Sequence, residues 1–559
     1  MTMFQKQSLI TCRQPFYRHR SLLSLCFFIA NLSCAFSLQS AEVTYSDVLV
    51  YGATPAGVCA AVAAAREGAK VTLVEPMNLV GGIMSSGLSF SDSNQTDRRV
   101  LRGLFEEIHM RIAIDYAKRN VPLSYDVAVK DNKPWVYEPH VAEKVFNDML
   151  REAGVKVLLN QQLIGVAREQ IRITTLRTDK AEFTARQFID ASYEGDLMAA
   201  AKVSSVIGRE SKSQYGESLA GHQFPKPKVA VSPRDSEGKL LPLLSSEDAG
   251  ADETDGKVMT YSWRLCMTAN PSNRIALTKP ATYDPARFEI ARRLLKSGAN
   301  PQMVALDFYP IPGGKLDVNN GIGRQVSMGL IGHQWAWPEA SSATRAKIWQ
   351  QHKDYTLEFL WFLQTDPVVP EKTRQQIAKL GFCNDEFGAF DNWPPVLYIR
   401  EGRRMVGEFV MTQHDVLENI TKPDSIGISS FPIDSHDCQR VATSDGGWIN
   451  EGTIFPVHMN GTKYGQPHQV AYRCLTPKRT ECTNLLVPTC LSASHVAFSS
   501  IRVEPTWIVL GQSAGVAAAM AAKNNSTVQE LSIEKLQSRL RKVSQVIDLL
   551  PEHLAKHVN

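Results

Sequence analysis

The sequence predicts an α/β fold that begins with a β-α-β unit of a parallel sheet. The run DVLVY (47–51) is apolar and rich in β-branched residues, as strands buried in parallel sheets are. The Ala-rich run PAGVCAAVAAAREG (55–68) has the composition of a helix, and KVTLVE (70–75) has that of a second strand. Because phosphates bind where such strands end and such helices begin, the unit predicts a nucleotide site near Thr54.

The turn inside this unit departs from the dinucleotide fingerprint G-x-G-x-x-G at its middle position, which is Thr54. Gly52 permits the tight turn, and Gly57 lets the helix and the strand pack closely. The Thr54 side chain must turn aside from a phosphate, and its hydroxyl offers a donor to one. Glu75 ends the second strand, where a carboxylate accepts hydrogen bonds from a ribose diol. A β-α-β unit that binds nothing is the alternative.

Four further segments bear on the fold. We expect a loop over 79–89, and strand or helix character in 154–170, 183–201 and 484–522. The first contains the doublet Gly81-Gly82 in a loop, and the third reads as a strand that ends at Asp190. In the last segment we expect a strand and then a helix that begins at GQSAG (511–515).

These segments resemble the FAD-dependent oxidoreductases of the glutathione-reductase-like superfamily. They resemble most a secreted bacterial branch, some of whose members are called xanthan lyases, and the motifs that carry this likeness are YGATPAG, YEPHVAEKVFNDML, YSWRLCMTANPSNR, YIREGRRMVGEFVMT, YRCLTPK and ASHVAFSSIRVEPT. The likeness runs from about Val48 to Ala522, and a Thr at the middle fingerprint position is familiar in that branch. It implies FAD as cofactor, and a Rossmann-like FAD-binding domain of the glutathione-reductase type with an inserted mixed α+β substrate domain.

The resemblance also implies which residues hold FAD. The pyrophosphate would be wrapped by Gly52, Thr54, Pro55, Ala56 and Gly57. The adenosine side would be held by Glu75, Val157, Asp190 and Ala191, and the phosphates or the ribityl chain by Gly81 and Gly82. The flavin would meet a helix N-terminus formed by Gly511, Gln512, Ser513, Ala514 and Gly515. One departure is that VPTCLSASH (487–495) lacks the acid that many relatives carry before the last helix, which puts the ribityl contact in doubt.

Residues 1–41 predict a signal peptide for export. They hold four basic residues and no acid, and the apolar run LLSLCFFIANL (22–32) is followed by small residues. The run is shorter than the about 20 residues of a membrane-spanning helix. We therefore expect a periplasmic or extracellular protein with no stable membrane span after signal removal, with a retained N-terminal anchor as the alternative.

The predicted domain boundaries are 42–205 and 466–530 for the two parts of the FAD-binding domain, 206–465 for the inserted substrate domain and 531–559 for a C-terminal helical tail. Within the middle, 286–298 and 342–365 read as amphipathic helices. The basic residues of the leader account for the whole net charge of +4, so the remainder is neutral and no nucleic-acid partner is expected. The cysteines match no zinc spacing, and we expect no metal.

Two residues near the expected flavin are candidates for chemistry. A neutral His495 is suited to take a substrate proton, the alternative being a histidine bonded to the backbone. Arg502 is suited to anchor an anionic substrate group or to stabilise the reduced flavin, the alternative being a buried ion pair. For Arg400 and Arg404 we expect one face of a helix, solvated or salt-bridged.

The expected function is that of a secreted FAD-dependent oxidoreductase that transfers hydride between the flavin and a small organic substrate, with a carbohydrate derivative as one candidate. The alternative is a non-redox carbohydrate lyase or a binding protein on a flavoprotein-like scaffold. The sequence identifies no electron acceptor, and the absence of a second complete nucleotide fingerprint disfavours a resident NAD(P)H site.

Overall fold

The predicted β-α-β unit is present in the computed structural model, which describes residues 43–554 apart from 124, 126–133, 251–253, 419 and 460–461. Strand β1 (Thr44–Tyr51) pairs in parallel with β2 (Val71–Val74), and α1 (Pro55–Arg66) connects them. The predicted signal peptide lies outside the described residues.

The first sheet extends this unit in the order β3-β2-β1-β6-β5-β4, with β20 beside the second half of β6. Strands β1, β2, β3, β6 and β20 are parallel, whereas β4 and β5 form an antiparallel hairpin against the first half of β6. The added strands are β3 (Lys156–Leu158), β4 (Leu163–Glu169), β5 (Arg172–Thr178), β6 (Glu182–Asp190) and β20 (Leu485–Leu486). The predicted α/β fold is thus confirmed, with a Rossmann-type sheet at its centre.

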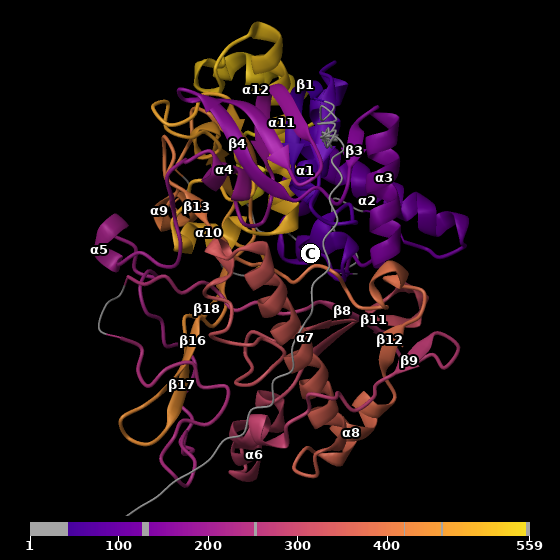
Figure 1. Ribbon diagram of the computed structural model, residues 1–559, viewed down its shortest axis with the longest axis vertical. Helices are drawn as coiled ribbons and strands as arrows, with labels where there is room; N and C mark the ends of the chain where they lie inside the picture. Colours follow the sequence, from indigo (N-terminus) through magenta and orange to yellow (C-terminus); the bar gives the residue numbers. More distant parts are fainter. Residues whose placement is uncertain are drawn as a thin grey trace, which may run out of the picture. The chain divides into compact units, whose positions relative to one another are not determined.

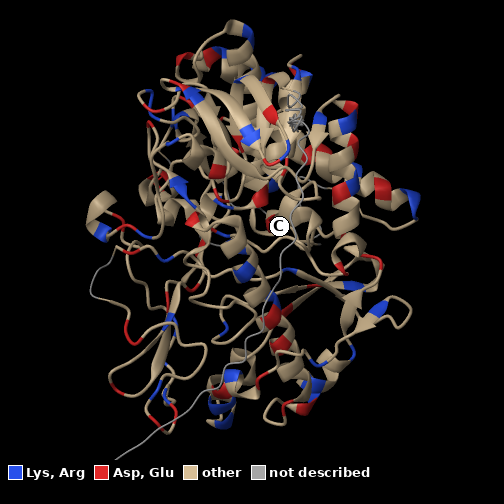
Figure 2. Ribbon diagram, in the orientation of Figure 1, with Lys and Arg blue, Asp and Glu red and all other residues tan. Residues whose placement is uncertain are grey.

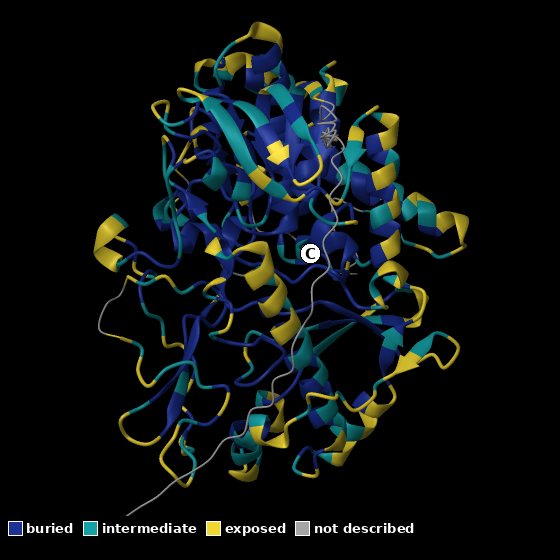
Figure 3. Cartoon of the chain, in the orientation of Figure 1, coloured by how far each residue is buried: buried dark blue, intermediate teal, exposed yellow. Residues whose placement is uncertain are grey.

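Segments from the two ends of the chain build this part together. Helix α1 packs against α11 (Glu504–Asn524), so the indigo and yellow segments of Figure 1 lie side by side, and both helices are almost fully buried (Figure 3). The remaining helices packed here are α2 (Leu104–Lys118), α3 (Pro139–Glu152), α4 (Asp196–Ala200), α9 (Gln413–Leu417), α10 (His495–Ile501) and α12 (Ile533–Lys542). Helix α13 (Pro551–Leu554) ends the described chain.

The expectation that a helix begins at Gly511 is wrong. Helix α11 begins at Glu504, because Val503 is extended and Pro505 favours a first helical turn. Gly511 lies in the middle of the helix, where a Cβ atom would come within 2.2 Å of the Ala56 carbonyl oxygen. A Cβ on Gly515 would lie 2.2 Å from the Ala60 carbonyl oxygen. The small residues of GQSAG therefore let two helix backbones touch, rather than open a helix.

A second, antiparallel sheet forms from the middle of the chain in the order β10-β11-β8-β12-β9. Its strands are β8 (Leu265–Thr268), β9 (Arg274–Ala276), β10 (Asp307–Ile311), β11 (Lys315–Asn319) and β12 (Gly381–Cys383). With it lie α6 (Glu289–Lys296), α7 (Ser342–Thr365) and α8 (Glu371–Ala378) (Figure 1). The amphipathic helices predicted over 286–298 and 342–365 are confirmed by α6 and α7.

The described residues also form four two-stranded pairs and α5 (Lys212–Tyr215). The pairs are β7 (Ser205–Val206) with β13 (Arg404–Met405), β14 (Ser425–Ser429) with β19 (His468–Ala471), β15 (Ile433–Ser435) with β18 (Ile454–Val457), and β16 (Gln439–Ala442) with β17 (Trp448–Glu451).

The described residues form two main hydrophobic clusters. Residues well before 466, the predicted start of the second part of the FAD-binding domain, already pack into the first cluster. The second cluster draws on Val229 to Ile399 together with Trp448. From Met411 onward, buried residues such as Ile426 and Ile428 pack with the first sheet and α11. The predicted domain boundaries stay predictions, but the two hydrophobic clusters indicate that the chain rejoins the first cluster near Met411.

Charges of both signs are interspersed along the ribbon, with no extended stretch of one sign (Figure 2). Among the described residues, no helix combines the length and the apolar character needed to cross a lipid bilayer.

We predict that Gly511→Ala and Gly515→Ala each destabilise the protein by about 1–3 kcal/mol, because the added methyl group overpacks the contact between α1 and α11. Urea unfolding of the purified variants measures this. Gly388→Ala is the control, since a Cβ there meets nothing within 4 Å. Release of FAD from Gly511→Ala without loss of stability would instead favour the cofactor role predicted from the sequence.

Candidate functional site

A cavity of about 750 Å³ lies where β1 and β2 end. Four predicted FAD residues line it, and they are Gly52, Thr54, Glu75 and Gly82. The wall is completed by the loop after β6, which includes Tyr193, and by residues from the middle of the chain such as Trp337 and Ile399. The structure therefore brings together the Gly-rich turn, the acid of β2 and the second glycine doublet, as the sequence predicts.

The Gly-rich turn leaves no room for larger residues. Gly52 has a positive φ of 96°, and a Cβ there would lie 2.8 Å from the Ser192 nitrogen. A Cβ on Gly57 would overlap the Gly52 carbonyl oxygen at 1.8 Å. Pro55, Ala56 and Gly57 form the first turn of α1, whose N-terminus faces the end of β1.

Thr54 is the N-cap of α1. Its hydroxyl accepts a hydrogen bond from the Gly57 N–H at 3.2 Å and donates one to the Ala191 carbonyl at 2.7 Å. The hydroxyl proton that the sequence analysis offered to a phosphate is thus used within the protein. The threonine instead stabilises the helix end, as N-cap residues do, and ties it to β6.

Glu75 is a buried acceptor at the cavity wall. Its carboxylate accepts hydrogen bonds from the Ala53 N–H at 2.5 Å and the Met77 N–H at 2.8 Å. Burial raises the pKa of Glu75 to about 7, although these two hydrogen bonds oppose the shift. Its carboxylate has further lone pairs for hydroxyl donors, as a ribose diol requires.

The second glycine doublet closes one side of the cavity. Both glycines have positive φ, 96° for Gly81 and 52° for Gly82. A Cβ on Gly82 would lie 2.4 Å from the Tyr193 hydroxyl oxygen, which accepts a hydrogen bond from the Ile83 N–H. Only glycine keeps the loop this close to Tyr193.

Asp190, Ala191 and Val157 support the cavity without lining it. Asp190 accepts hydrogen bonds from the Ser192 N–H and hydroxyl and from the Met198 N–H. It therefore shapes the loop that carries Tyr193, and burial raises its pKa to about 6. Val157 pairs with Leu73 inside the sheet.

The segment from Gly511 to Gly515 lies away from this cavity. Gln512 accepts a hydrogen bond from the Leu104 N–H at 2.7 Å and lines a separate groove. Ser513 donates to the Ile426 carbonyl. These contacts are structural, so the assignment of the segment to FAD stays a prediction that the geometry does not favour.

Two arginines bring positive charge to the cavity, and the sequence analysis missed both. Arg345, in α7, donates to both oxygens of Asp196, and Arg403 donates to the same carboxylate at 3.0 Å. Against the effect of burial, these arginines lower the pKa of Asp196. Arginines are well suited to balance a pyrophosphate. Both lie far along the chain from Gly52, so no local motif reveals them.

His495 is held in a saturated network. Its Nδ1 lies 2.9 Å from Glu401 Oε1, and its Nε2 lies 3.2 Å from Ser435 Oγ. Arg404 pairs with Glu401 and with Glu210, and against the effect of burial His495 and Arg404 lower the pKa of Glu401. Ser435, His495 and Glu401 have the order of a hydrolytic triad, but the serine also bonds the Gly452 carbonyl and is fully buried.

The prediction of a helix over Arg400 to Arg404 is wrong, and so is that of a solvated face. Arg400 to Arg403 have no regular secondary structure, and Arg404 begins β13. Arg400 is 1% exposed and Arg404 is fully buried. The polar sequence REGRR suggests solvent exposure, but this segment runs between the two hydrophobic clusters.

Arg502 belongs to a second buried group of charges, which we call the interior polar cluster: Asp92, Arg264, Asp317, Tyr398, Arg400, Asp434, Arg502 and Glu504. Arg502 donates to the Asp434 carbonyl at 2.9 Å and lies 3.6 Å from Asp434 Oδ1. The cluster and the cavity share one segment of the chain, because Val396 and Ile399 line the cavity while Tyr398 and Arg400 belong to the cluster.

Within this cluster, Arg264 holds Asp317 through two hydrogen bonds of 2.5 and 2.9 Å. Burial and the neighbouring Asp92 raise the pKa of Glu504 well above its usual range. Glu504 is the first residue of α11. The sequence analysis missed it because IRVEPT shows no sign that its acid is buried.

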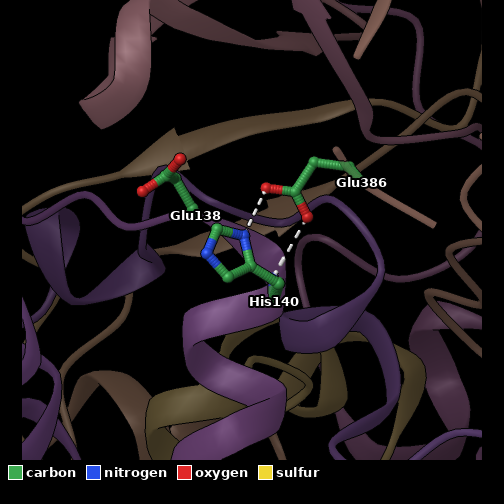
Figure 4. Close-up of side chains that lie close together, drawn as sticks. All are labelled: Glu138, His140 and Glu386. Atoms are coloured by element: carbon green, nitrogen blue, oxygen red, sulfur yellow. Dashed lines mark hydrogen bonds and ion pairs between the residues drawn. The ribbon is translucent and has the colours of Figure 1, made fainter. Parts of the chain in front are cut away.

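A third group joins the first sheet's α3 to the second sheet. Glu138, His140 and Glu386 lie close together (Figure 4), and His140 Nδ1 is 2.7 Å from Glu386 Oε1. The Lys315 ammonium lies 2.8 Å from Glu138 and 2.7 Å from Glu386. It supplies to these carboxylates the positive charge that a metal ion would supply, so we read the group as a salt-bridge network.

The cavity residues fit a flavin dinucleotide. The volume is within the range of ligand sites, roughly 300–1,000 Å³. The first-turn N–H of Ala56 has no carbonyl partner in its own helix, as is general at helix starts. Gly52 and Gly82 keep the walls open to a phosphate chain, Glu75 offers an acceptor, and Arg345 offers charge.

Of the comparisons with known proteins, the one with family models identifies the cofactor class. Residues 47–540 match the family model described as FAD dependent oxidoreductase. No curated protein matches. Solved structures match over part of the chain only, and their TM-scores are too low to carry an argument.

Three of these structures are a 3-ketosteroid-delta4-(5alpha)-dehydrogenase from Rhodococcus jostii RHA1, an L-amino acid deaminase from Proteus vulgaris and an L-proline dehydrogenase from P. horikoshii. Their identities to this chain are 15%, 17% and 15%, and their TM-scores are 0.20, 0.23 and 0.24. The matches cover 30%, 35% and 35% of this chain, and 50%, 56% and 63% of the other chains. The chain thus spans about half to two thirds of these proteins.

The family model covers nearly all of the described residues, including the Gly-rich turn, the wall of the cavity and α11. The chain therefore belongs to the FAD dependent oxidoreductase family and uses FAD as its cofactor.

Proposed function

We propose that this chain is an exported flavoenzyme that transfers hydride between a small organic substrate and FAD. The observation that carries the proposal is the cavity at the ends of β1 and β2, which combines Gly52, Glu75 and Gly82 in a chain of the FAD dependent oxidoreductase family. A carbohydrate derivative stays one candidate substrate. The electron acceptor stays open.

We further propose the glutathione-reductase-type arrangement. The strand order β3-β2-β1-β6-β20 with the β4-β5 hairpin supports it. The second sheet and its helices would then form the inserted substrate domain. A non-redox lyase or a binding protein is not favoured, because neither gives FAD a role.

Different residues of the chain hold different parts of FAD. Gly52, Gly82 and the first turn of α1 bind the pyrophosphate, and Glu75 orients the adenosine ribose. Bound FAD supplies a two-electron hydride acceptor. A proton must move with the hydride when an alcohol or amine is oxidised, and the carboxyl of Glu504, whose pKa is raised by burial, is the candidate to carry it.

We predict that FAD affinity falls as pH falls through about 7, because protonation of Glu75 removes a charged acceptor for the ribose hydroxyls. The sign follows from the carboxylate being present above this pKa and lost below it. Glu75→Gln should bind FAD roughly 10- to 100-fold more weakly and without this pH dependence. Fluorescence titration of the apoprotein with FAD between pH 5.5 and 8.5 measures both. An unchanged pH profile in the variant would refute the role of Glu75.

We predict that export removes the leader. Mass spectrometry of the protein recovered outside the cytoplasm should give a new N-terminus between Phe36 and Glu42. A protein that retains Met1 in the cytoplasm would overturn this part of the proposal.

We predict that His495→Ala lowers stability by about 1–3 kcal/mol, because Glu401 and Ser435 lose a buried hydrogen-bond partner. FAD content and urea unfolding measure the effect. Normal stability combined with slow flavin reduction by substrate, rescued at higher pH, would show instead that His495 carries the substrate proton.

A further inference from the structure

Arg400 is a buried cation without a carboxylate partner among the described residues. Its Nη1 donates to the Thr260 carbonyl at 2.7 Å, and its Nη2 donates to Ser262 Oγ at 2.8 Å. The guanidinium lies 4.7 Å from the centre of the Tyr398 ring. Its Nε is buried and has no hydrogen-bond partner in the described part of the chain.

Other buried arginines differ from Arg400 in one of two ways. Arg209, Arg264 and Arg404 each contact at least one carboxylate. Arg440 contacts none, but all three of its nitrogens donate to the neutral oxygens of Leu243, Gln325 and Asn450. Arg440 is thus satisfied as a structural residue, whereas Arg400 retains both a charge and a donor.

Other arginines lie close to Arg400, together with the acid Asp434. Arg502, like Arg400, has a buried Nε without a partner. His436 is buried near both, and burial together with these arginines lowers its pKa well below the usual range. Asp317 is held by Arg264, and Asp434 lies 3.6 Å from Arg502. Asp434 also acts on Arg400 electrostatically, but it forms no ion pair with Arg400 among the described residues.

A buried charge without a counter-ion is costly, and burial lowers the pKa of Arg400 to about 9, which still leaves it charged at neutral pH. An arginine kept in this state suits a protein whose counter-ion arrives with a ligand. The guanidinium fork matches a carboxylate, which accepts two parallel hydrogen bonds. Ile399, the preceding residue, lines the FAD cavity, so a ligand at Arg400 would lie beside the cofactor.

We propose that Arg400, assisted by Arg502, binds the carboxylate of the substrate, which makes the substrate a small organic acid such as a hydroxy acid or a sugar acid. The proposal rests on the proposed function, because it gives the substrate class of the same redox site. It assigns recognition to Arg400, and leaves proton transfer to the carboxyl of Glu504.

The test uses the FAD-loaded protein with acetate and glycolate as probes and acetamide as the neutral match. Both carboxylates should change the visible spectrum of the bound flavin and raise the melting temperature in a saturable way, whereas acetamide should do neither. Arg400→Gln should bind acetate roughly 10- to 100-fold more weakly, as expected for loss of hydrogen bonds to a charged group.

Melting temperatures distinguish a ligand-binding role of Arg400 from a structural one. In buffer without carboxylates, Arg400→Gln should melt no lower than the wild type, because it removes an unpaired buried charge. Arg440→Gln is the matched control, and it should melt lower because it removes satisfied hydrogen bonds. If neither variant folds, the wild-type titration with acetate and acetamide still decides whether a carboxylate site exists.

Three outcomes would overturn the inference. Acetate binding that is unchanged in Arg400→Gln would place the anion elsewhere. A lowered flavin reduction potential with normal acetate binding would show that Arg400 serves the reduced flavin. Absence of carboxylate binding in a protein whose FAD is present and reducible by dithionite would refute the substrate class and leave the flavoenzyme intact.

Discussion

The close contact of α1 with α11 is the constraint on which the rest of the structure depends. It joins residues from the two ends of the chain through backbone surfaces that only small side chains allow, namely Ala56 and Ala60 on one side and Gly511 and Gly515 on the other. With α11 fixed there, its first residue, Glu504, reaches the interior polar cluster while α1 presents its N-terminus at the end of β1. One packing contact thus sets the distance between the cofactor cavity and the charges beside it.

The β-α-β unit and the part of the cavity that it forms could be predicted, because the residues that determine them lie close together in the sequence. Gly52, Gly57 and Glu75 lie within one β-α-β unit, and a turn that tolerates no Cβ leaves its mark directly in the sequence. The same holds for α6 and α7, whose apolar periodicity is complete within each helix. Thr54 was placed correctly at the turn, although its hydroxyl serves the helix cap and β6 rather than a phosphate.

The buried charged groups could not be predicted, because the packing of distant segments decides which charged residues are buried. Arg400 and Glu504 stand in polar stretches that resemble surface, and nothing near them in the sequence shows which other segments cover them. Gly511 was misread for the related reason that glycines at i and i+4 mark both helix starts and close helix contacts. The placement of His495 beside the flavin stays a prediction, and the partners that saturate it, Glu401 and Ser435, come from distant segments.

Strand β15 contacts two polar groups, the His495 network and the interior polar cluster. They differ in how completely their polar atoms are hydrogen-bonded. Ser435 contacts His495, while the preceding residue, Asp434, contacts Arg502. On the first side Glu401 is bonded by both His495 and Arg404, which is what a buried ionic network needs in order not to destabilise the fold. On the second side the Nε atoms of Arg400 and Arg502 each lack a hydrogen-bond partner among the described residues. Selection for stability alone would saturate or remove such groups, so the unsaturated side of β15 is where binding and chemistry are to be sought.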